Sequence, residues 1–295
     1  MSGAKVEVGR VGLWTNQLDG QPVGRVLEAT REIEELGFSA LWAGELFGRE
    51  ALTQAALLLA ATSRMTIATG VANVYGRDPV TMAQGQRTLL EAYGDRFVLG
   101  LGISHPWFVE QVRGHVYGPR VATMRGYLDR MDAAPFGPPG AEKRGPRVIG
   151  AVGSKMLRLA AGRAHGALPL GMPVEHTART RELLGPDRFL GVVLPVVLGP
   201  DDAATRDIAR TYVAESLPNR ADVLRELGFD VDLHGREASR LVRSAVAWGG
   251  PEAIAARVDE HLAAGADHVA FSVTGGVAEE LPLAEWRELA ALTRR

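Results

Sequence analysis

Short apolar runs alternate along the chain with segments whose apolar residues recur at helical spacing. The first run is Val11–Thr15, and Arg25–Leu36 then repeats its apolar residues every three or four positions until Gly37 ends the predicted helix. A later helix is expected to begin at Pro79, with Asp78 as its cap. The runs predict the strands Val11–Thr15, Ser39–Glu45, Met65–Asn73, Phe97–Ser104, Arg147–Val152, Ala167–Leu170, Phe189–Leu198 and Val269–Thr274.

Helices are predicted between and after most of these strands. They cover Arg25–Leu36, Ala51–Ala61, Pro79–Tyr93, Val121–Ala133, Lys155–Ala164, Glu175–Leu184 and Pro251–Ala264. Pro195 is expected to bend or bulge the seventh strand. More than sixty residues separate the seventh strand from the eighth, which predicts an insertion that includes Asp201–Leu227.

This order of elements predicts an α/β fold, a (β/α)₈ TIM barrel with an insertion between strands 7 and 8. A doubly wound sheet is less favoured, because it usually stops at fewer strands and carries a glycine fingerprint after the first one. The first turn here, Thr15–Gly20, lacks that fingerprint. Since no break in composition divides the alternation, residues 1–295 are expected to form a single domain.

Composition narrows the classes of function. A hydrophobic content of 46% with 35 glycines suits a buried parallel sheet, and no apolar run reaches the length of a membrane span. A net charge of −2 with scattered basic residues disfavours nucleic acid as a partner, and the absence of cysteine excludes disulfides and thiolate chemistry. The first ten residues carry no stretch like a signal peptide, which favours a cytoplasmic location.

In a barrel of this kind, ligands bind at the carboxyl ends of the strands. Those ends are mostly polar, aromatic and uncharged, which favours a flat conjugated ring as the ligand. They supply Trp14, Thr15, Asn16, Glu45, Asn73, Tyr75, Ser104, His105, Gly153–Met156, Gly171 and Thr274–Gly276. No metal is expected, because only Glu45 and His105 there are good ligands, and the remaining candidates are assigned to helices or loops: His176, His261 and His268.

One strand end carries the pattern of a phosphate site. After the fifth strand, Gly153 lets the chain turn, Ser154 is positioned to cap, and a helix begins near Lys155. The unpaired N–H groups at such a helix start attract an anion. The same residues also suit an ordinary helix cap with no ligand. The segment Thr274–Gly276 is a competing phosphate site after the eighth strand.

Several motifs in this order resemble the luciferase-like monooxygenase superfamily. They are Leu41–Glu45, Ile67–Asn73, Arg77-Asp78-Pro79, Arg96–Gly102 and the Gly153 loop, and the resemblance spans roughly residues 10 to 275. Within the superfamily, the chain is most similar to the oxidoreductases that depend on coenzyme F420. The resemblance implies a TIM barrel and a deazaflavin whose phosphate lies on the amides of Gly153, Ser154, Lys155 and Met156. It also implies a bulge with a cis peptide bond between Gly70 and Val71.

The resemblance implies further roles at the site. Asn73 is expected beside the polar edge of the ring and Glu45 near its reactive face, although each also suits a supporting role. Arg77 is expected either to steady the anionic tail of the cofactor or to pair with Asp78. The sequence departs from relatives that have a histidine at the position of Leu46.

A second departure lies after the fourth strand. Trp107 lies near the place where some relatives have a catalytic acid. His105 is therefore the best local acid or base, and it is equally well interpreted as a packed histidine.

These features predict an F420-dependent oxidoreductase that transfers a hydride between the deazaflavin and a small carbonyl, alcohol or unsaturated substrate. Trp14, Phe47, Trp107 and part of the insertion are expected to hold that substrate. One alternative is an FMN-dependent monooxygenase of the same superfamily, for which a trans peptide bond at Gly70-Val71 is expected. Another is a non-catalytic protein that binds a flavin or deazaflavin. A homodimer is expected in each case.

Overall fold

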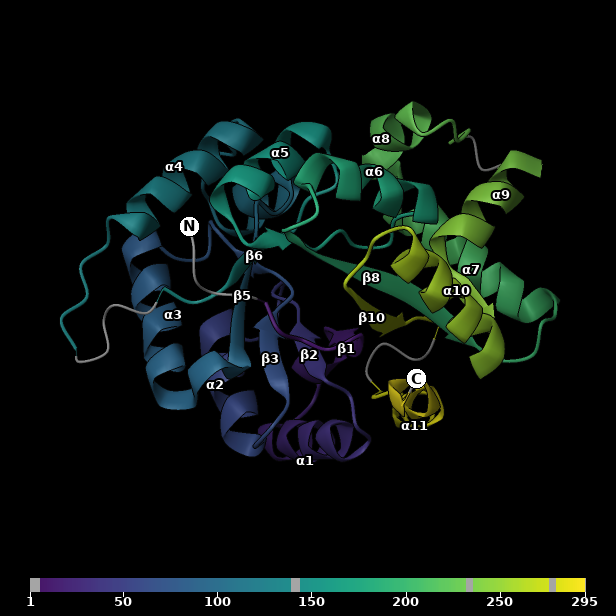
Figure 1. Cartoon of the computed structure of the whole chain (residues 1–295), viewed down its shortest axis with the longest axis horizontal. Helices are drawn as coiled ribbons and strands as arrows, with labels where there is room; N and C mark the ends of the chain where they lie inside the picture. The colour runs from purple at the N-terminus through teal and green to yellow at the C-terminus, as the bar shows by residue number, and fades with distance from the viewer. Residues whose placement is uncertain (1–5, 139–143, 232–235, 276–279, 295) are drawn as a thin grey trace.

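Parallel strands close into a barrel of eight within the residues that the structure describes. The structure is a computed structural model, and it describes residues 6–138, 144–231, 236–275 and 280–294 (Figure 1). Neighbouring strands pair in the order β10-β1-β2-β3-β5-β6-β7-β8, and the pairing of β8 with β10 closes the barrel. The predicted TIM barrel is therefore confirmed.

The strands agree in number and order with the prediction, apart from a divided third strand and one addition. Their bounds are β1 Val11–Thr15, β2 Ala40–Ala43, β3 Thr66–Thr69, β4 Ala72–Asn73, β5 Phe97–Gly102, β6 Arg147–Ile149, β7 Gly166–Ala167, β8 Phe189–Leu198, β9 Ala247–Gly249 and β10 His268–Val273. The predicted strand Met65–Asn73 divides into β3 and β4 at Gly70-Val71. The additional strand β9 extends the sheet beyond the barrel by pairing with the end of β8.

Helices surround the barrel, as Figure 1 shows. Their bounds are α1 Val23–Glu35, α2 Ala51–Ala61, α3 Pro79–Tyr93, α4 Arg120–Asp132, α5 Ser154–Arg163, α6 Val174–Leu184, α7 Ala203–Ser216, α8 Ala221–Glu226, α9 Arg236–Ala245, α10 Pro251–Ala263 and α11 Leu283–Leu289. The predicted start of α3 is confirmed. Asp78 precedes Pro79, the first residue of the helix, and its carboxylate accepts hydrogen bonds from the Val80 and Thr81 amides. None of the helices in the described segments is long and apolar enough to cross a bilayer.

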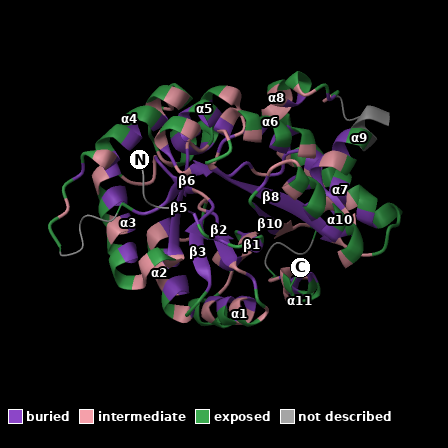
Figure 2. Ribbon diagram, viewed as in Figure 1, coloured by how far each residue is buried: buried purple, intermediate pink, exposed green. Residues whose placement is uncertain are grey.

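Two apolar clusters follow from the alternation of side chains along each strand. In β2, Leu41 belongs to the cluster between the strands and the helices, whereas Trp42 belongs to a second cluster with Val98, Phe189 and Ala270. Successive residues of a strand point to opposite faces, so the second cluster fills the inside of the barrel. Figure 2 shows the strands buried and the helices exposed on their outer faces.

A buried histidine is part of this inner cluster. The indole Nε1 of Trp42 lies 3.1 Å from Nε2 of His268, and an indole nitrogen only donates, so His268 Nε2 accepts. His268 Nδ1 therefore carries the proton and donates it to the Gly9 carbonyl at 2.9 Å. The assignment of His268 to a helix or loop is wrong, because it begins β10, whereas His176 and His261 lie in α6 and α10.

Two expectations about strands are also corrected. The register between β8 and β10 runs without a bulge through Pro195, which faces Ser272. On its other side, β8 last pairs with the segment after β7 at the bridge between Leu170 and Val193, and it first pairs with β9 at Val196. Pro195 lies between these two pairings, so its lack of an N–H breaks no hydrogen bond of the sheet. The strand β7 is shorter than predicted, because Pro169 has no N–H to continue the ladder, and pairing beyond it is limited to the isolated bridge between Leu170 and Val193.

The predicted insertion is present between β8 and β10. It contains α7, α8, α9 and β9, and its apolar residues, such as Val213, Leu217 and Leu224, form a third cluster with Met172 and Val197. The insertion therefore packs on the ends of β7 and β8, at the carboxyl end of the barrel. It adds a wall beside the place where the site is expected.

Candidate active site

A bulge between β3 and β4 shapes the floor of the site. The peptide bond between Gly70 and Val71 is cis, as the resemblance to the F420-dependent branch implies. The side chain of Val71 points toward glycines of neighbouring strands, where a Cβ on Gly102 would lie 2.5 Å from Val71 Cγ2 and one on Gly150 would lie 3.2 Å from it. These glycines leave the space that the Val71 side chain fills.

Trp14 at the end of β1 completes this floor. Its indole N–H donates to the Gly70 carbonyl, and a Cβ on Gly70 would lie 2.8 Å from the indole nitrogen. Trp14, Val71 and Leu170 are partly buried and cap the inner apolar cluster of the barrel. The floor is thus apolar and fixed to the backbone of the bulge.

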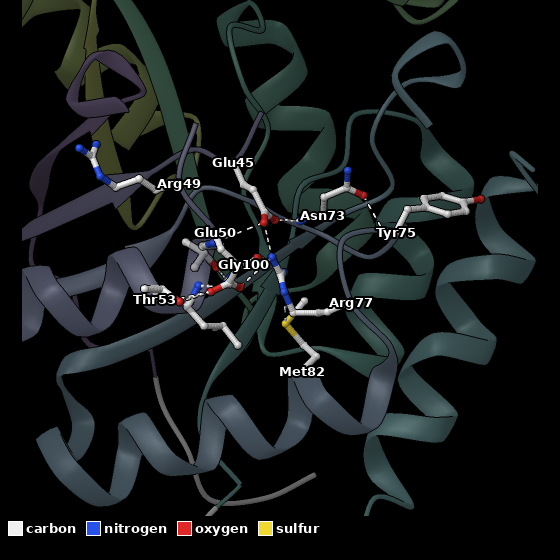
Figure 3. A network of polar contacts seen from close by, with 12 residues as sticks. Glu45, Arg49, Glu50, Thr53, Asn73, Tyr75, Arg77, Met82 and Gly100 are labelled. Atoms are coloured by element: carbon white, nitrogen blue, oxygen red, sulfur yellow. Dashed lines mark hydrogen bonds and ion pairs between the residues drawn. The ribbon is translucent and has the colours of Figure 1, made fainter. Parts of the chain in front are cut away.

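An ion-pair network supports the bulge from the side of β2 (Figure 3). The Glu45 carboxylate accepts from the Asn73 amide at 2.6 Å and pairs with the Arg77 guanidinium, which also lies 2.8 Å from Glu50. The Glu45 and Arg77 side chains are only 4% and 7% exposed. Because both charges are buried and paired, this network holds strand ends together and faces the protein interior.

These contacts place Glu45 and Arg77 differently from the expectation. Arg77 pairs with Glu45 and Glu50, and Asp78 instead caps α3, so the expected pair between Arg77 and Asp78 is wrong. The Arg77 guanidinium has little surface left for the tail of a cofactor. The Glu45 carboxylate is buried beside the strand that follows the bulge. Its roles as acid, base or ligand stay predictions, and this buried, paired position does not favour them.

Asn73 offers an unused donor at the site. Its side-chain Oδ1 accepts from the Tyr75 amide at 2.9 Å, whereas its Nδ2 is buried and has no hydrogen-bond partner among the described residues. In Figure 3 the Asn73 side chain turns away from the ion pairs toward Tyr75. A buried amide N–H without an acceptor is costly, so this donor suits the polar edge of a ligand.

The start of α5 presents free backbone amides. The Met156 and Leu157 amides donate to the Gly153 carbonyl, but none of the hydrogen bonds among the described residues uses the amides of Ser154 and Lys155. Gly153 is the cap residue, and no side chain in the described part of the chain caps this helix, so the cap predicted for Ser154 is wrong. A Cβ on Gly153 would meet nothing within 4 Å, which leaves space in front of these amides.

His176 holds the loop that leads to this helix, a role that the sequence did not reveal. Its Nε2 lies 2.8 Å from the Val152 carbonyl and its Nδ1 lies 3.2 Å from the Thr180 hydroxyl. Burial lowers the pKa of His176 to about 4, so the ring is neutral at physiological pH and donates from Nε2 to the carbonyl. The helix of His176 thereby fixes the residue next to Gly153.

Aromatic side chains gather on the loops after β2 and β5. The ring centroids of Phe47 and Trp107 are 5.9 Å apart, and each ring also contacts the buried Phe108. Phe47 is 66% exposed and Trp107 is 44% exposed. The structure therefore brings together two of the three residues predicted to hold the substrate, while their role stays a prediction.

His105 lies at the mouth of the barrel, after β5. Ser104 before it has a φ of 61°, which turns the chain so that His105 is exposed. Partial burial lowers the pKa of His105, and the positive charges of Arg220 and Arg120 lower it further. The ring is therefore neutral at physiological pH, when it is able to accept a proton.

A cleft of about 450 Å³ opens beside the floor. Trp14, Leu170 and Val193 contribute its apolar side, and the segment Ser272–Gly275 at the carboxyl end of β10 forms one wall. The opposite wall comes from the insertion and consists of Tyr212, Ser216 and Arg220. Sequence reasoning missed these three residues, and the only signal for them was the insertion itself.

The remaining expectations concern phosphate and metal. Gly276 of the competing phosphate segment lies outside the described residues, whereas Thr274 and Gly275 line the cleft. Among the described residues, no three side chains of histidine, aspartate or glutamate are grouped so that they could hold a metal ion.

Comparisons with known proteins agree with this geometry. Residues 7–268 match the family model described as luciferase-like monooxygenase. A Mycobacterium tuberculosis protein named "Putative coenzyme F420-dependent oxidoreductase Rv3520c" is 31% identical over 120 residues, which cover 41% of this chain and 35% of that relative.

Solved structures share the fold across nearly the whole chain. An F420-dependent secondary alcohol dehydrogenase in complex with an F420-acetone adduct has a TM-score of 0.75 at 14% identity, covering 96% of this chain and 97% of that chain. The FMN complex of the oxygenating constituent of 3,6-diketocamphane monooxygenase from Pseudomonas putida has a TM-score of 0.70 at 13% identity, covering 97% of each chain. Because the family model matches residues 7–268, which are most of this chain, the chain belongs to the luciferase-like monooxygenase family.

Proposed function

We propose that this protein is an oxidoreductase that uses coenzyme F420 and transfers a hydride between the deazaflavin and a small carbonyl, alcohol or unsaturated substrate. The observation that carries the proposal is the pair of free amides at Ser154 and Lys155, which open beside an apolar floor at the carboxyl end of the barrel. Free amides at a helix start bind phosphate. The mycobacterial relative, named as F420-dependent, supports the choice of cofactor.

The residues present fit such a coenzyme. The Ser154 and Lys155 amides would hold its phosphate, Val71 and Trp14 would contact the ring, and the free Nδ2 of Asn73 would donate to a polar ring atom. The coenzyme would supply the two electrons of the reaction as a hydride. The floor orients the reacting face and keeps water from it, since its side chains are apolar and anchored.

The other side chains have supporting roles in this proposal. Glu45 and Arg77 position the bulge, and Phe47 and Trp107 close over the substrate from the loops above. When a carbonyl is reduced, the hydride adds to carbon and a proton must add to oxygen. In the reverse direction, the oxidation of an alcohol, that proton leaves the oxygen. His105 is the titratable side chain that we assign to accept it, because it is exposed at the mouth and its lowered pKa keeps the ring neutral.

Direct titration tests the cofactor. We expect the purified protein to bind coenzyme F420 with a change in its fluorescence and to bind FMN more weakly. Tighter binding of FMN would favour the monooxygenase alternative, which the FMN-bound neighbour supports. Binding of F420 without turnover of any carbonyl or alcohol in a panel would favour a non-catalytic binding protein.

A proline variant tests the phosphate contact. Ser154 is the first residue of α5, and Gly153 before it is extended at φ −80° and ψ 142°, so Ser154→Pro should keep the helix and remove one amide donor. We expect F420 affinity to fall by about 10-fold or more, the value of a hydrogen bond to a charged group. Ser154→Ala keeps the amide and should bind normally. Val23→Pro, at the first residue of α1, is the matched control for a proline at a helix start.

We also propose that the protein forms a homodimer in the cytoplasm. The exposed side chains of Val112 and Val116, which are 53% and 86% accessible, are apolar surface that a second copy could cover. Sedimentation analysis tests this assembly.

A further inference from the structure

One cation stands out in the cleft beside the floor. Arg220 is the only charged side chain among the described residues that line the cleft. It is half-buried, and within the described chain no carboxylate forms an ion pair with it. A buried charge is normally paired, because its transfer from water is costly. The described residues therefore supply no carboxylate as a counter-ion for Arg220.

The contacts of Arg220 fix its guanidinium without neutralising it. One Nη donates to the Leu170 carbonyl and lies 4.0 Å from the Met172 sulfur. The chain turns at Gly171, whose φ is 59°, and a Cβ there would lie 2.6 Å from the Tyr212 hydroxyl and 3.3 Å from Arg220 Nη1. Only glycine leaves room for both side chains, which hold the guanidinium at the edge of the cleft.

The neighbouring titratable groups do not supply negative charge. Burial raises the pKa of Tyr212, so its hydroxyl remains protonated and able to donate. The positive charge of Arg220 contributes to the lowered pKa of both His105 and His176. Arg220 thus lies among neutral donors and neutral rings, in an electrostatic environment that favours an incoming anion.

We propose that Arg220 binds a carboxylate group of the substrate and so directs the reaction to carboxylate-bearing carbonyl or alcohol compounds. A single cation in the cleft balances a single negative charge, and the planar guanidinium matches a carboxylate. The apolar side of Trp14, Leu170 and Val193 would contact the carbon skeleton. Anion binding follows from the cleft itself, whereas its assignment to the substrate rests on the proposed function.

The cleft at Arg220 and the floor where the coenzyme ring is proposed to lie share a residue. Trp14 belongs to both surfaces, since it lines the cleft and donates to the Gly70 carbonyl of the bulge. A substrate whose carboxylate is held at Arg220 would therefore extend over Trp14 toward the floor. His105, whose pKa responds to the charge of Arg220, lies on the same mouth.

The experiment uses the full-length protein without coenzyme and two probes, benzoate and its uncharged analogue benzamide. A carboxylate bound at Arg220 would cancel part of the charge that lowers the pKa of His105. We therefore expect benzoate to raise that pKa, followed by NMR of the imidazole and assigned with His105→Gln. Benzamide should not raise it.

Three variants make the test specific. Arg220→Gln keeps a donor for the Leu170 carbonyl and should bind benzoate at least 10-fold more weakly, whereas Arg220→Lys should retain part of the affinity. Arg120→Gln removes the other cation near His105 and should leave the benzoate effect intact. Equal benzoate binding by Arg220→Gln, equal binding of benzamide, or tighter binding of inorganic phosphate would overturn the proposal.

Coenzyme titrations separate the two proposals. Arg220→Gln should bind F420 as the unmodified protein does. If F420 fails to bind while benzoate binds at Arg220, the proposed function is wrong and the anion site stands. If F420 binds and benzoate does not, the proposed function stands and the carboxylate site is wrong.

Discussion

The Asn73 amide donates a 2.6 Å hydrogen bond to Glu45 Oε2, and this contact fastens the strand after the bulge to the end of β2. Glu45→Ala removes that acceptor and leaves the buried Arg77 with only the half-exposed Glu50. We expect a loss of roughly 3 kcal/mol in the free energy of unfolding, since an unpaired buried charge is costly. Urea denaturation measures it. Glu50→Ala removes the exposed end of the network and also the side chain that caps α2, so it should cost about 1 kcal/mol, less than Glu45→Ala.

The same contact distinguishes a positioning role of Glu45 from a catalytic one. Glu45→Gln keeps an acceptor for the Asn73 amide and removes the charge. A positioning role predicts weaker coenzyme binding, with kcat at saturating coenzyme changed by less than about 10-fold. A general acid or base would lose about 100-fold or more in kcat. Steady-state kinetics with a separate coenzyme titration decides between these roles.

A second prediction concerns the space that Val71 occupies. Gly102→Ala would place a methyl group 2.5 Å from Val71 Cγ2. We expect the variant to lose about 1–3 kcal/mol of stability, as overpacked cores do, and to bind coenzyme less tightly because the floor moves. Adding Val71→Ala removes the clashing methyl groups and should restore much of the stability. If the double variant is no more stable than Gly102→Ala, the clash is not the cause.

The barrel could be predicted from the sequence because its signals are local. Apolar runs, the cap at Asp78 and the glycine after α1 each specify an element from neighbouring residues alone. The strand β8 has the predicted bounds for this reason. The break in the third strand, by contrast, was inferred from a resemblance and not from periodicity.

The site was harder to predict because its contacts join distant segments. Glu45 and Arg77 each looked like groups that face a ligand, and only the fold shows that they neutralise each other. Arg220 has no motif around it, and its importance comes from a cleft whose other walls lie up to about 200 residues away in the chain. Local patterns carry no information on such pairings.

Buried histidines predict a loss of stability in acid. Burial lowers the pKa of His268 to about 4, so on acidification the unfolded chain binds this proton first, near pH 6.5. The stabilisation is therefore complete above pH 6.5 and is lost as pH falls toward 4. The loss is on the order of 3 kcal/mol for a shift of this size. Urea denaturation across this pH range measures the slope.

The variant His268→Gln tests whether His268 causes this pH dependence of the free energy of unfolding. His268→Gln cannot titrate, so its stability should fall less steeply between pH 6.5 and 4, although it should be less stable at pH 8. His176 and His261, with pKa values lowered to about 4 and about 3, should still contribute. An unchanged slope in His268→Gln would show that His268 does not bind the proton.

The last prediction concerns the pH dependence of turnover. If His105 transfers the proton, it must be neutral to accept one, and kcat/KM for alcohol oxidation should fall as His105 becomes protonated. Because burial, Arg220 and Arg120 lower the pKa of His105, the fall should lie below pH 6.5. Arg120→Gln removes one of the two charges and should move the fall to higher pH, while His105→Gln should abolish it. A pH profile that both variants leave unchanged would exclude His105, and the proton would then have to pass directly to solvent through the open cleft beside Arg220.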